Sequence, residues 1–346
     1  MNSTITTTRE TVSPLIDIEE LKREGKIFRE NDGASIIDIG DKVALVEFHT
    51  KANALSDVIL DMLSAAAHEG LEKFDAIVIG NRGRHFSAGA NLAWLHEAAR
   101  AGKFKEVEES MRRLQDINML LKYGPVPVVA APFSNALGGG AEIVLHSSKV
   151  IATEDLHMGL VEAGVGLIPA GGGTKELRLR ALSNFSDNGN SDLLSALQNV
   201  FKVIFSAKVS KNGAEAKQLF LSSEDVVVPF KDSPIELAKQ YAVELLHNGF
   251  SKANSNTIIP VPGITGINIF QERIGYMLNS KAITEHDAVI AQHIATVLCG
   301  GNVLSGTATE QQFLDLEREA FVSLLGTQKT QERIEYLLKN NKPLHN

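Results

Sequence analysis

Three short segments rich in glycine and alanine constrain the fold of this sequence more than any other feature. The apolar stretch Ala76–Gly80 leads into Arg84–Leu92 (RHFSAGANL), and the extended stretch Val126–Pro132 leads into Asn135–Glu142 (NALGGGAE). The third segment, Gly159–Thr174, contains GLVEAG and IPAGGGT. Small residues where a strand gives way to a helix leave backbone N–H groups unpaired and uncovered by side chains. The first two segments therefore predict strand-to-helix junctions that are open to a ligand.

Hydrophobic periodicity around these segments predicts alternating strands and helices. Two apolar segments, Ala34–Ile39 and Val43–Phe48, flank Gly40–Lys42, and a Gly-Asp pair between two such segments is typical of a β-hairpin. Ser56 can begin a helix whose apolar residues recur at helical spacing. A further strand is expected at Lys149–Thr153. The order β-β-α-β-α-β-α-β indicates an α/β domain assembled from repeated ββα-like units.

The length of 346 residues favours one large domain with an appended subdomain. We expect an N-terminal extension over residues 1–30 with a short helix near Ile18–Glu24, a core over residues 31–248 and a helical C-terminal subdomain over residues 249–346. The polar sequence NFSDNGNSD at 184–192 predicts a loop or insertion. In the tail, one apolar helix face is predicted from the spacing of Phe313, Leu316, Ala320 and Leu324.

Composition argues against several classes of protein. Lys and Arg total 34 against 42 Asp and Glu, and this acidic balance without a basic cluster argues against nucleic acid as a partner. No apolar run approaches the ~20 residues that a membrane-spanning helix needs, and the first residues lack the pattern of a signal peptide. A single cysteine, Cys299, excludes an internal disulfide framework and a multi-cysteine metal site. We therefore expect a cytoplasmic protein.

Several common functional motifs are incomplete in this sequence. Gly164–Pro169 (GVGLIP) has proline where a dinucleotide fingerprint needs its third glycine. Gly172–Lys175 (GGTK) has threonine before lysine, so it is no phosphate-binding loop. A nucleophile elbow would need glycine at the position of His85. The glycine-rich segments are thus left as the candidates for chemistry.

Those segments can form one site. Two backbone N–H groups aimed at one point make an oxyanion hole, provided that small residues let a ligand oxygen approach. Glu142 and Glu162 each follow such a segment and can lie close to the same point. Two carboxylates beside an oxyanion hole suit proton transfer at a carbon next to a carbonyl. Taken singly, the glycines also fit a plain tight turn, Glu142 a first-turn glutamate that satisfies the helix dipole, and Glu162 a solvated charge.

In order and spacing, the three segments resemble the crotonase (enoyl-CoA hydratase/isomerase) superfamily. SAGAN at 87–91 stands where the family has S/A-A-G-A-D, and GGGAE at 138–142 matches its G-G-G-x-E. The distance from Glu162 to IPAGGGT reproduces that from the family's second glutamate to its I-P-x-x-G-G-T. This resemblance covers about residues 34–247. It implies a crotonase-like spiral of repeated ββα units with a C-terminal helical subdomain.

The resemblance also implies the role of each site residue. The implied residues are Ala90 and Gly139 as oxyanion-hole N–H donors, Glu142 and Glu162 as the acid/base pair, and Ala88, Lys51 and Ala52 as contacts of coenzyme A. Lys51 fits a plain surface lysine equally well. Coenzyme A belongs to the substrate, so neither a separate cofactor nor a metal is implied. The sequence departs from the family pattern at Asn91, where the usual residue is aspartate, and in the segment 184–192.

The tail, Phe313–Gly326 and Thr330–Asn346, resembles the hydratase half of bacterial two-part 3-hydroxyacyl-CoA dehydrogenase/enoyl-CoA hydratase proteins. Because no usable dinucleotide fingerprint is present, we expect no dehydrogenase half in this sequence. A standalone relative and a portion of a longer protein both remain open. The implied partners are an acyl-CoA thioester substrate, a trimer or hexamer of identical chains, and a separate or fused 3-hydroxyacyl-CoA dehydrogenase.

Three functions stay open at this point. The first is an enoyl-CoA hydratase that adds water across a 2-trans-enoyl-CoA thioester in fatty-acid β-oxidation. The second is an enoyl-CoA isomerase or acyl-CoA thioester hydrolase on the same scaffold, where relatives keep one acid or reposition it. The third is a non-catalytic acyl-CoA-binding or assembly module. The presence of both Glu142 and Glu162 favours the hydratase.

Overall fold

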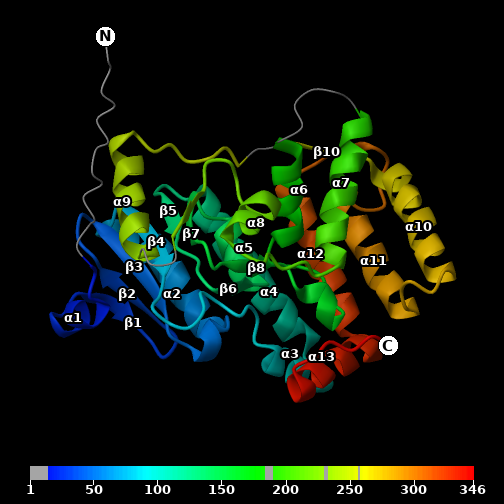
Figure 1. The fold of residues 1–346 in the computed structure, drawn as a ribbon, viewed down its shortest axis with the longest axis horizontal. Coiled ribbons are helices and arrows are strands. Elements are labelled where there is room, and N and C mark those ends of the chain that lie inside the picture. Colours follow the sequence, from blue (N-terminus) through cyan, green and yellow to red (C-terminus); the bar gives the residue numbers. More distant parts are fainter. Residues whose placement is uncertain (1–14, 184–189, 230–232, 256–257) are drawn as a thin grey trace, which may run out of the picture.

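The computed structural model describes residues 15–183, 190–229, 233–255 and 258–346 (Figure 1). Within these residues the largest sheet has seven strands in the order β1-β2-β3-β4-β5-β7-β9. The strands are β1 (Ile27–Glu30), β2 (Ala34–Asp38), β3 (Val43–Phe48), β4 (Ala76–Gly80), β5 (Val128–Ala130), β7 (Lys149–Thr153) and β9 (Val226–Val228). Strands β1 to β3 pair antiparallel, and β3, β4, β5, β7 and β9 pair parallel. The predicted α/β fold and the β2–β3 hairpin are confirmed.

Helices occupy most of the remaining described chain. They are α1 (Ile18–Arg23), α2 (Asp57–His68), α3 (Leu92–Arg100), α4 (Phe104–Tyr123), α5 (Gly139–Leu145), α6 (Gly173–Ser183), α7 (Asn190–Phe205), α8 (Gly213–Leu219), α9 (Pro234–His247), α10 (Gly263–Asn279), α11 (Glu285–Leu298), α12 (Glu310–Leu325) and α13 (Gln328–Asn340). Short 3-10 turns lie at Lys51–Asn53, Glu69–Glu72 and Glu162–Val165.

Two segments differ from the sequence-based expectation. β1 begins at Ile27, so the last four residues of the expected extension over 1–30 join the sheet by pairing with β2. Of the loop expected over 184–192, residues 184–189 lie outside the described chain, and α7 begins at Asn190. The short helix expected near Ile18–Glu24 is present as α1.

Both faces of the large sheet are covered, which explains why all six residues of β3 are buried. Successive side chains of a strand point to opposite faces. Val43 and Leu45 pack into the apolar cluster beneath α9, whereas Ala44 and Val46 pack into the larger cluster that includes α2. A strand buried on both sides reads as a nearly continuous apolar run instead of an alternating one, as in β3, where Glu47 is the one charged residue.

Two smaller sheets complete the described strands. β6 (Asn135–Leu137) pairs parallel with β8 (His157–Gly159), and β10 (Ile259–Val261) pairs antiparallel with β11 (Gly306–Ala308). β6 lies within the second glycine-rich segment, directly before α5. The smaller β6–β8 sheet therefore carries the segment that the sequence singled out.

The C-terminal helices pack on the part of the molecule away from β1 to β3 (Figure 1). α12 contacts α4, α6 and α11, and α13 contacts α3 and the turn Glu162–Val165. The apolar face predicted for the tail is confirmed, because Phe313 and Leu324 are fully buried in α12, with Ala320 nearly so and Leu316 packed at the edge of the core.

A buried ion cluster ties α12 to the core. Lys175 Nζ of α6 lies 2.7 Å from Glu310 Oε2 of α12 and 2.5 Å from Glu176 Oε1. Lys122 Nζ of α4 lies 2.6 Å from Glu176 Oε1 and 3.1 Å from Glu310 Oε2. Burial opposes ionisation of Glu176, but the positive charges of Lys175 and Lys122 outweigh it and hold its pKa below the usual value. Each buried charge thus has an opposite charge in contact.

Replacing Glu310 by alanine should destabilise the protein by about 3 kcal/mol, because breaking a buried ion pair leaves the partner charge without compensation. Glu176 remains beside both lysines, so the loss should lie at the lower end of the range for such changes. Urea denaturation measures it. The exposed pair Lys103–Glu106 supplies the control, since Glu106→Ala should change the free energy of unfolding by less than about 1 kcal/mol. Equal effects at the two positions would contradict the structural role of the cluster.

Candidate active site

The first two glycine-rich segments lie side by side because their backbones pair. Ser87 forms a parallel bridge with Ala136 of β6. The Ser87 N–H donates to Asn135 O over 3.0 Å, and the Leu137 N–H donates to Ser87 O over 3.0 Å. Ala90 and Gly139 each lie three residues beyond the bridged pair, so the pairing brings the two predicted oxyanion donors to the same level.

Close approach of these backbones requires glycine at two positions. Gly89 has φ +86°, and a Cβ there would lie 2.6 Å from Leu137 O. Gly138 has φ +51°, and a Cβ there would lie 3.1 Å from Glu162 Oε1. A side chain at Gly89 would meet both backbone strain and a steric clash, and one at Gly138 would meet backbone strain and a tight contact with Glu162. The same distances show that the Glu162 carboxyl group reaches the Gly138 junction.

The N–H groups of Ala90 and Gly139 are free to bind a ligand. Gly139 is the first residue of α5, where an N–H has no partner inside the helix. Within the described residues, neither N–H donates a hydrogen bond to the protein. Both residues line the same cavity. The arrangement is compatible with the predicted oxyanion hole.

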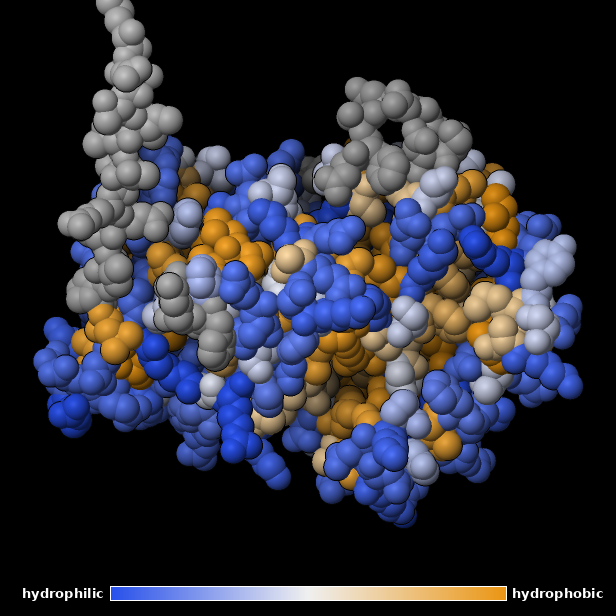
Figure 2. All heavy atoms as spheres, viewed as in Figure 1, coloured by the Kyte–Doolittle hydropathy of each residue, from blue (hydrophilic) through white to orange (hydrophobic). Residues whose placement is uncertain are grey.

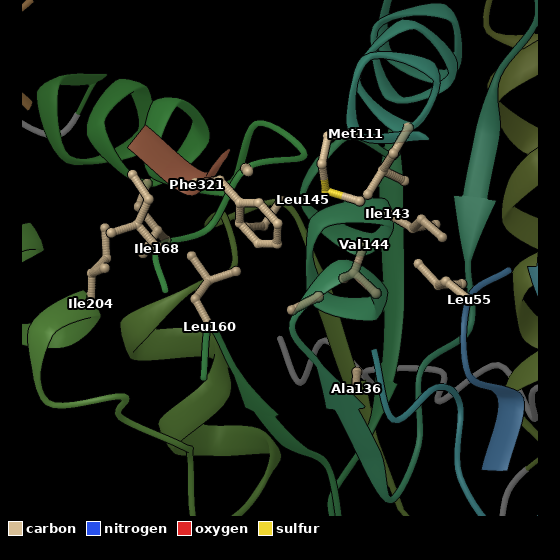
Figure 3. Packing of buried hydrophobic residues seen from close by; sticks show 14 of the residues in the cluster. Leu55, Met111, Ala136, Ile143, Val144, Leu145, Leu160, Ile168, Ile204 and Phe321 are labelled. Atoms are coloured by element: carbon tan, nitrogen blue, oxygen red, sulfur yellow. The ribbon is translucent and has the colours of Figure 1, made fainter. Parts of the chain in front are cut away.

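The cavity has a volume of about 540 Å³ and is mostly apolar. Glu142 and Glu162 both line it, together with Ala88 and the two junctions. Its apolar wall includes Trp94 and Leu95 of α3, Met111 and Leu114 of α4, Phe321 of α12 and Leu337 of α13. Figure 2 shows apolar surface around a hollow next to α3 and α13, and Figure 3 shows Leu55, Met111 and Phe321 arranged around α5.

Glu142 is held by a glycine-rich turn. It lies in the first turn of α5 and is 2% exposed. Its Oε1 accepts hydrogen bonds from Gly171 N (2.7 Å) and Gly173 N (2.9 Å). A Cβ on Gly171 would lie 2.4 Å from Glu142 Oε2, so this contact needs glycine. Burial raises the pKa of Glu142 to about 7, although the two N–H groups and Lys175 act in the opposite direction.

Glu162 also faces the cavity, but its carboxyl group has fewer hydrogen-bond partners. It begins the 3-10 turn Glu162–Val165 and is half-buried. Its Oε2 is shielded from solvent and has no hydrogen-bond partner within the described chain. Burial and the nearby charge of Glu142 raise the pKa of Glu162 well above its usual value. The pKa values of both carboxyl groups are therefore raised, and the charge of Glu142 adds to the effect of burial at Glu162. Two carboxyl groups that bind a proton more strongly than usual thus line one cavity.

The predicted coenzyme A contacts are only partly brought together. Ala88 lines the cavity, whereas Lys51 and Ala52 are exposed residues of a 3-10 turn outside the cavity lining. The link between them is a hydrogen bond from the Ala88 N–H to Ala52 O over 3.1 Å. Asn91 caps α3, since its side-chain oxygen accepts from Trp94 N over 3.2 Å. Asparagine and aspartate serve equally well as such caps, which accounts for this departure from the family pattern.

Sequence reasoning missed the residues that hold Glu142. The Gly171–Gly173 run was noted as part of a family motif, and nothing in it indicated that its N–H groups bind a carboxylate. A run of glycines before a helix was the available signal, because the N-terminus of a helix attracts anions. Glu317, which binds the same turn from α12, left no signal in the sequence.

Comparison with known proteins agrees with this geometry. Residues 43–182 match the family described as "Enoyl-CoA hydratase/isomerase". Over 96% of its length the chain is 39% identical to a Bacillus subtilis protein named "Probable 3-hydroxyacyl-CoA dehydrogenase". This chain belongs to the crotonase superfamily. The predicted family and fold class are confirmed.

Further comparisons agree with the membership of this chain in the crotonase superfamily. A Rickettsia felis protein named "Putative fatty acid oxidation complex trifunctional enzyme" is 28% identical over 93% of the chain. The chain spans 41% of the length of both relatives. The crystal structure of an enoyl-CoA hydratase from Bacillus halodurans superposes with a TM-score of 0.59 and 17% identity, over 87% of this chain and 98% of that one. At this identity the likeness establishes the fold.

Two further features, a membrane-spanning helix and a metal-binding cluster, are absent from the described residues. No described helix is long and apolar enough to cross a membrane. The same part of the chain contains no cluster of His, Cys, Asp and Glu side chains able to hold a metal ion.

Replacing Glu162 by glutamine should stabilise the protein increasingly as the pH rises. Folding raises the pKa of Glu162 above 4.5, so the proton that it keeps stabilises the folded state at low pH. That contribution is lost as the pH rises toward the raised pKa, and glutamine does not titrate. The difference in free energy of unfolding between Glu162→Gln and the parent should therefore grow as the pH rises above 4.5, until it reaches the raised pKa.

Urea denaturation across this range measures the difference, and Glu335→Gln is the control. Glu335 is partly exposed, and a hydrogen bond with Lys339 lowers its pKa. It therefore stays ionised over the whole range, and its variant should differ from the parent by a constant amount. A constant difference for Glu162→Gln as well would show that Glu162 is ionised in the folded state.

Proposed function

We propose that this protein is a 2-trans-enoyl-CoA hydratase that acts in fatty-acid β-oxidation. The observation that carries the proposal is the pair Glu142 and Glu162, which line one cavity with raised pKa values and different hydrogen-bond surroundings. Hydration needs one group that takes a proton from water and another that delivers a proton to carbon. Relatives named for fatty acid oxidation support the metabolic setting.

In the proposed reaction, the thioester carbonyl oxygen accepts hydrogen bonds from the N–H groups of Ala90 and Gly139. These donors stabilise the negative charge that develops on this oxygen as an enolate forms. Glu142 takes a proton from water while the water oxygen bonds to Cβ, and Glu162 gives its proton to Cα as the enolate collapses. A proton then returns from Glu142 to Glu162 through solvent, so the net change is the addition of water.

The apolar wall of the cavity would hold the acyl chain. Coenzyme A would extend past Ala88, with Lys51 and Ala52 near its nucleotide. The product of hydration is a 3-hydroxyacyl thioester, and we propose that a 3-hydroxyacyl-CoA dehydrogenase consumes it, since the first relative is named for that activity. A homotrimer or hexamer remains a prediction from the family.

The alternatives differ in how many carboxyl groups they need. An isomerase or thioester hydrolase on this scaffold can work with one acid, and an acyl-CoA-binding module needs none. Both glutamates line the cavity here, and Glu162 Oε2 has no protein partner within the described residues. A solvent-shielded carboxyl oxygen without a partner favours a role toward the substrate.

Replacing either glutamate by glutamine should lower the rate of crotonyl-CoA hydration by ~10²–10⁴, because the variant keeps the shape of the side chain and cannot transfer a proton. The double variant should lose far less than the product of the single losses, since both groups act in one step. Loss of the enoyl-thioester absorbance measures the rate, and calorimetry should show that coenzyme A thioesters still bind.

Two outcomes would contradict this assignment. If Glu162→Gln hydrates at the parent rate while Glu142→Gln is inactive, a single-acid isomerase or hydrolase becomes the better description. If the parent protein binds enoyl-CoA thioesters of graded length tightly and converts none of them, the protein is a binding module. The same series of substrates defines the preferred chain length.

Replacing Gly139 by proline should lower turnover about a hundredfold, because proline removes one oxyanion donor. Proline is tolerated at the first position of a helix, which Gly139 occupies in α5. Gly139→Ala is the matched control, because it adds a Cβ as proline does, 2.7 Å from Leu55 Cδ1, but keeps the N–H group. Steady-state kinetics should place the alanine variant much closer to the parent. Similar rates for Gly139→Pro and Gly139→Ala, both with native circular dichroism, would remove Gly139 from the oxyanion hole.

A further inference from the structure

The turn that holds Glu142 also holds a second glutamate, which comes from the C-terminal tail. Glu317 of α12 is fully buried. Its Oε2 accepts from Gly172 N over 2.8 Å, and its Oε1 accepts from Lys175 N over 2.7 Å. Glu142 takes the N–H groups of Gly171 and Gly173. The N–H groups of residues 171, 172 and 173 thus bind Glu142, Glu317 and Glu142 in turn. A displacement of the N–H group bound to Glu317 therefore also displaces the N–H groups bound to Glu142.

The surroundings of Glu317 favour its neutral form. Burial and the charge of Glu142 raise its pKa well above the usual value, against the pull of Lys175 and of the two N–H groups. His146 lies on the other side of the turn, where a Cβ on Gly172 would come within 2.7 Å of its Cε1. Burial lowers the pKa of His146 to about 3, so this ring is uncharged too. The remaining charged groups near the turn are Lys175, Lys122, Glu176 and Glu310, which pair with one another.

The contacts of Glu317 go beyond those of a simple helix cap. Glu317 does satisfy the start of α6 (Gly173–Ser183), and a cap alone adds stability. Asn118 and Gln115 hold the carbonyl groups of Gly171 and Ala170 in this turn. Glu317 holds the N–H groups of Gly172 and Lys175, and the adjacent N–H groups carry the Glu142 carboxyl. The position of a catalytic carboxyl depends on such supporting contacts, and displacements of about 1 Å cost activity.

We propose that Glu317 is a positioning residue that fixes the Gly171–Lys175 turn so that Gly171 and Gly173 direct their N–H groups at Glu142. The role of Glu142 as the base rests on the proposed function, whereas the hold of Glu317 on the turn does not. The C-terminal tail would then complete the active site through this contact, from a helix that lies outside the family-matched residues 43–182.

The test compares Glu317→Ala, Glu317→Gln and the parent. Alanine removes both acceptors, so the turn relaxes and Glu142 loses hydrogen bonds that favour its ionised form. The pKa of Glu142 should rise by about one unit, which moves the acidic limb of kcat/KM to higher pH. kcat should fall about tenfold while KM stays within about twofold, because the substrate contacts are untouched. Glutamine keeps the shape but has a single acceptor oxygen, and its NH2 group would face one of the two N–H donors, so it should restore the parent profile only in part.

The titration of Glu142 is followed directly by carbon-13 NMR of its carboxyl group, assigned by the loss of its signal in Glu142→Gln. Glu319→Gln is the control on the same helix, since Glu319 lies on the exposed side of α12. It should leave both the thermal stability and the titration of Glu142 unchanged. If Glu317→Ala does not fold, Glu317→Asp, whose carboxyl is one methylene short of the turn, should shift the titration in the same direction.

A folded Glu317→Ala that loses stability and keeps the parent titration and kcat would overturn the proposal and leave a helix cap. A Glu317→Gln variant in which the pKa of Glu142 falls would overturn it too, because Glu317 would then act through its charge. If the parent hydrates no enoyl-CoA, the proposed function fails, whereas the NMR titration still decides whether Glu317 positions Glu142.

Discussion

The backbone pairing between Ser87 and Ala136 is the contact on which the site depends. It joins two segments that are far apart in the sequence, and it does so with main-chain hydrogen bonds that tolerate no slip in register. A shift of one residue would separate the N–H groups of Ala90 and Gly139. Gly89 and Gly138 allow the approach, because a Cβ on either would strike the opposite segment or Glu162.

A second constraint is the burial of several carboxyl groups at one helix N-terminus. Glu142 and Glu317 share the N–H groups ahead of α6, and Glu176 and Glu310 share Lys175 and Lys122 just beyond. Unpaired, any of these groups would cost several kcal/mol in an apolar interior. In this arrangement each of the four carboxyl groups has a hydrogen-bond or ion-pair partner. The same arrangement affects the pKa values of Glu142 and Glu162. Stability and the proposed chemistry therefore use the same groups.

Local patterns predicted the elements that carry strong periodicity or turn signals. The β2–β3 hairpin follows from two apolar segments around Gly40–Lys42, and the buried face of α12 follows from the spacing of Phe313 and Leu324. β6 escaped this reasoning, since a three-residue strand is too short to show a period. The placement of Lys51 and Ala52 outside the cavity also had no local signal, because exposure depends on what packs nearby.

The sequence by itself determined the chemical groups of the site and their order along the chain. The glycines at the junctions and the two glutamates at family spacing are defined by residue type and position, so both can be recognised in the sequence. Only the tertiary structure decided that both carboxyl groups bind a proton more strongly than usual and that α12 supplies Glu317 to the turn holding Glu142. Proton affinity depends on burial and on charges brought close by folding, and Glu317 reaches Gly172 across 145 residues of sequence. No local pattern encodes such a contact.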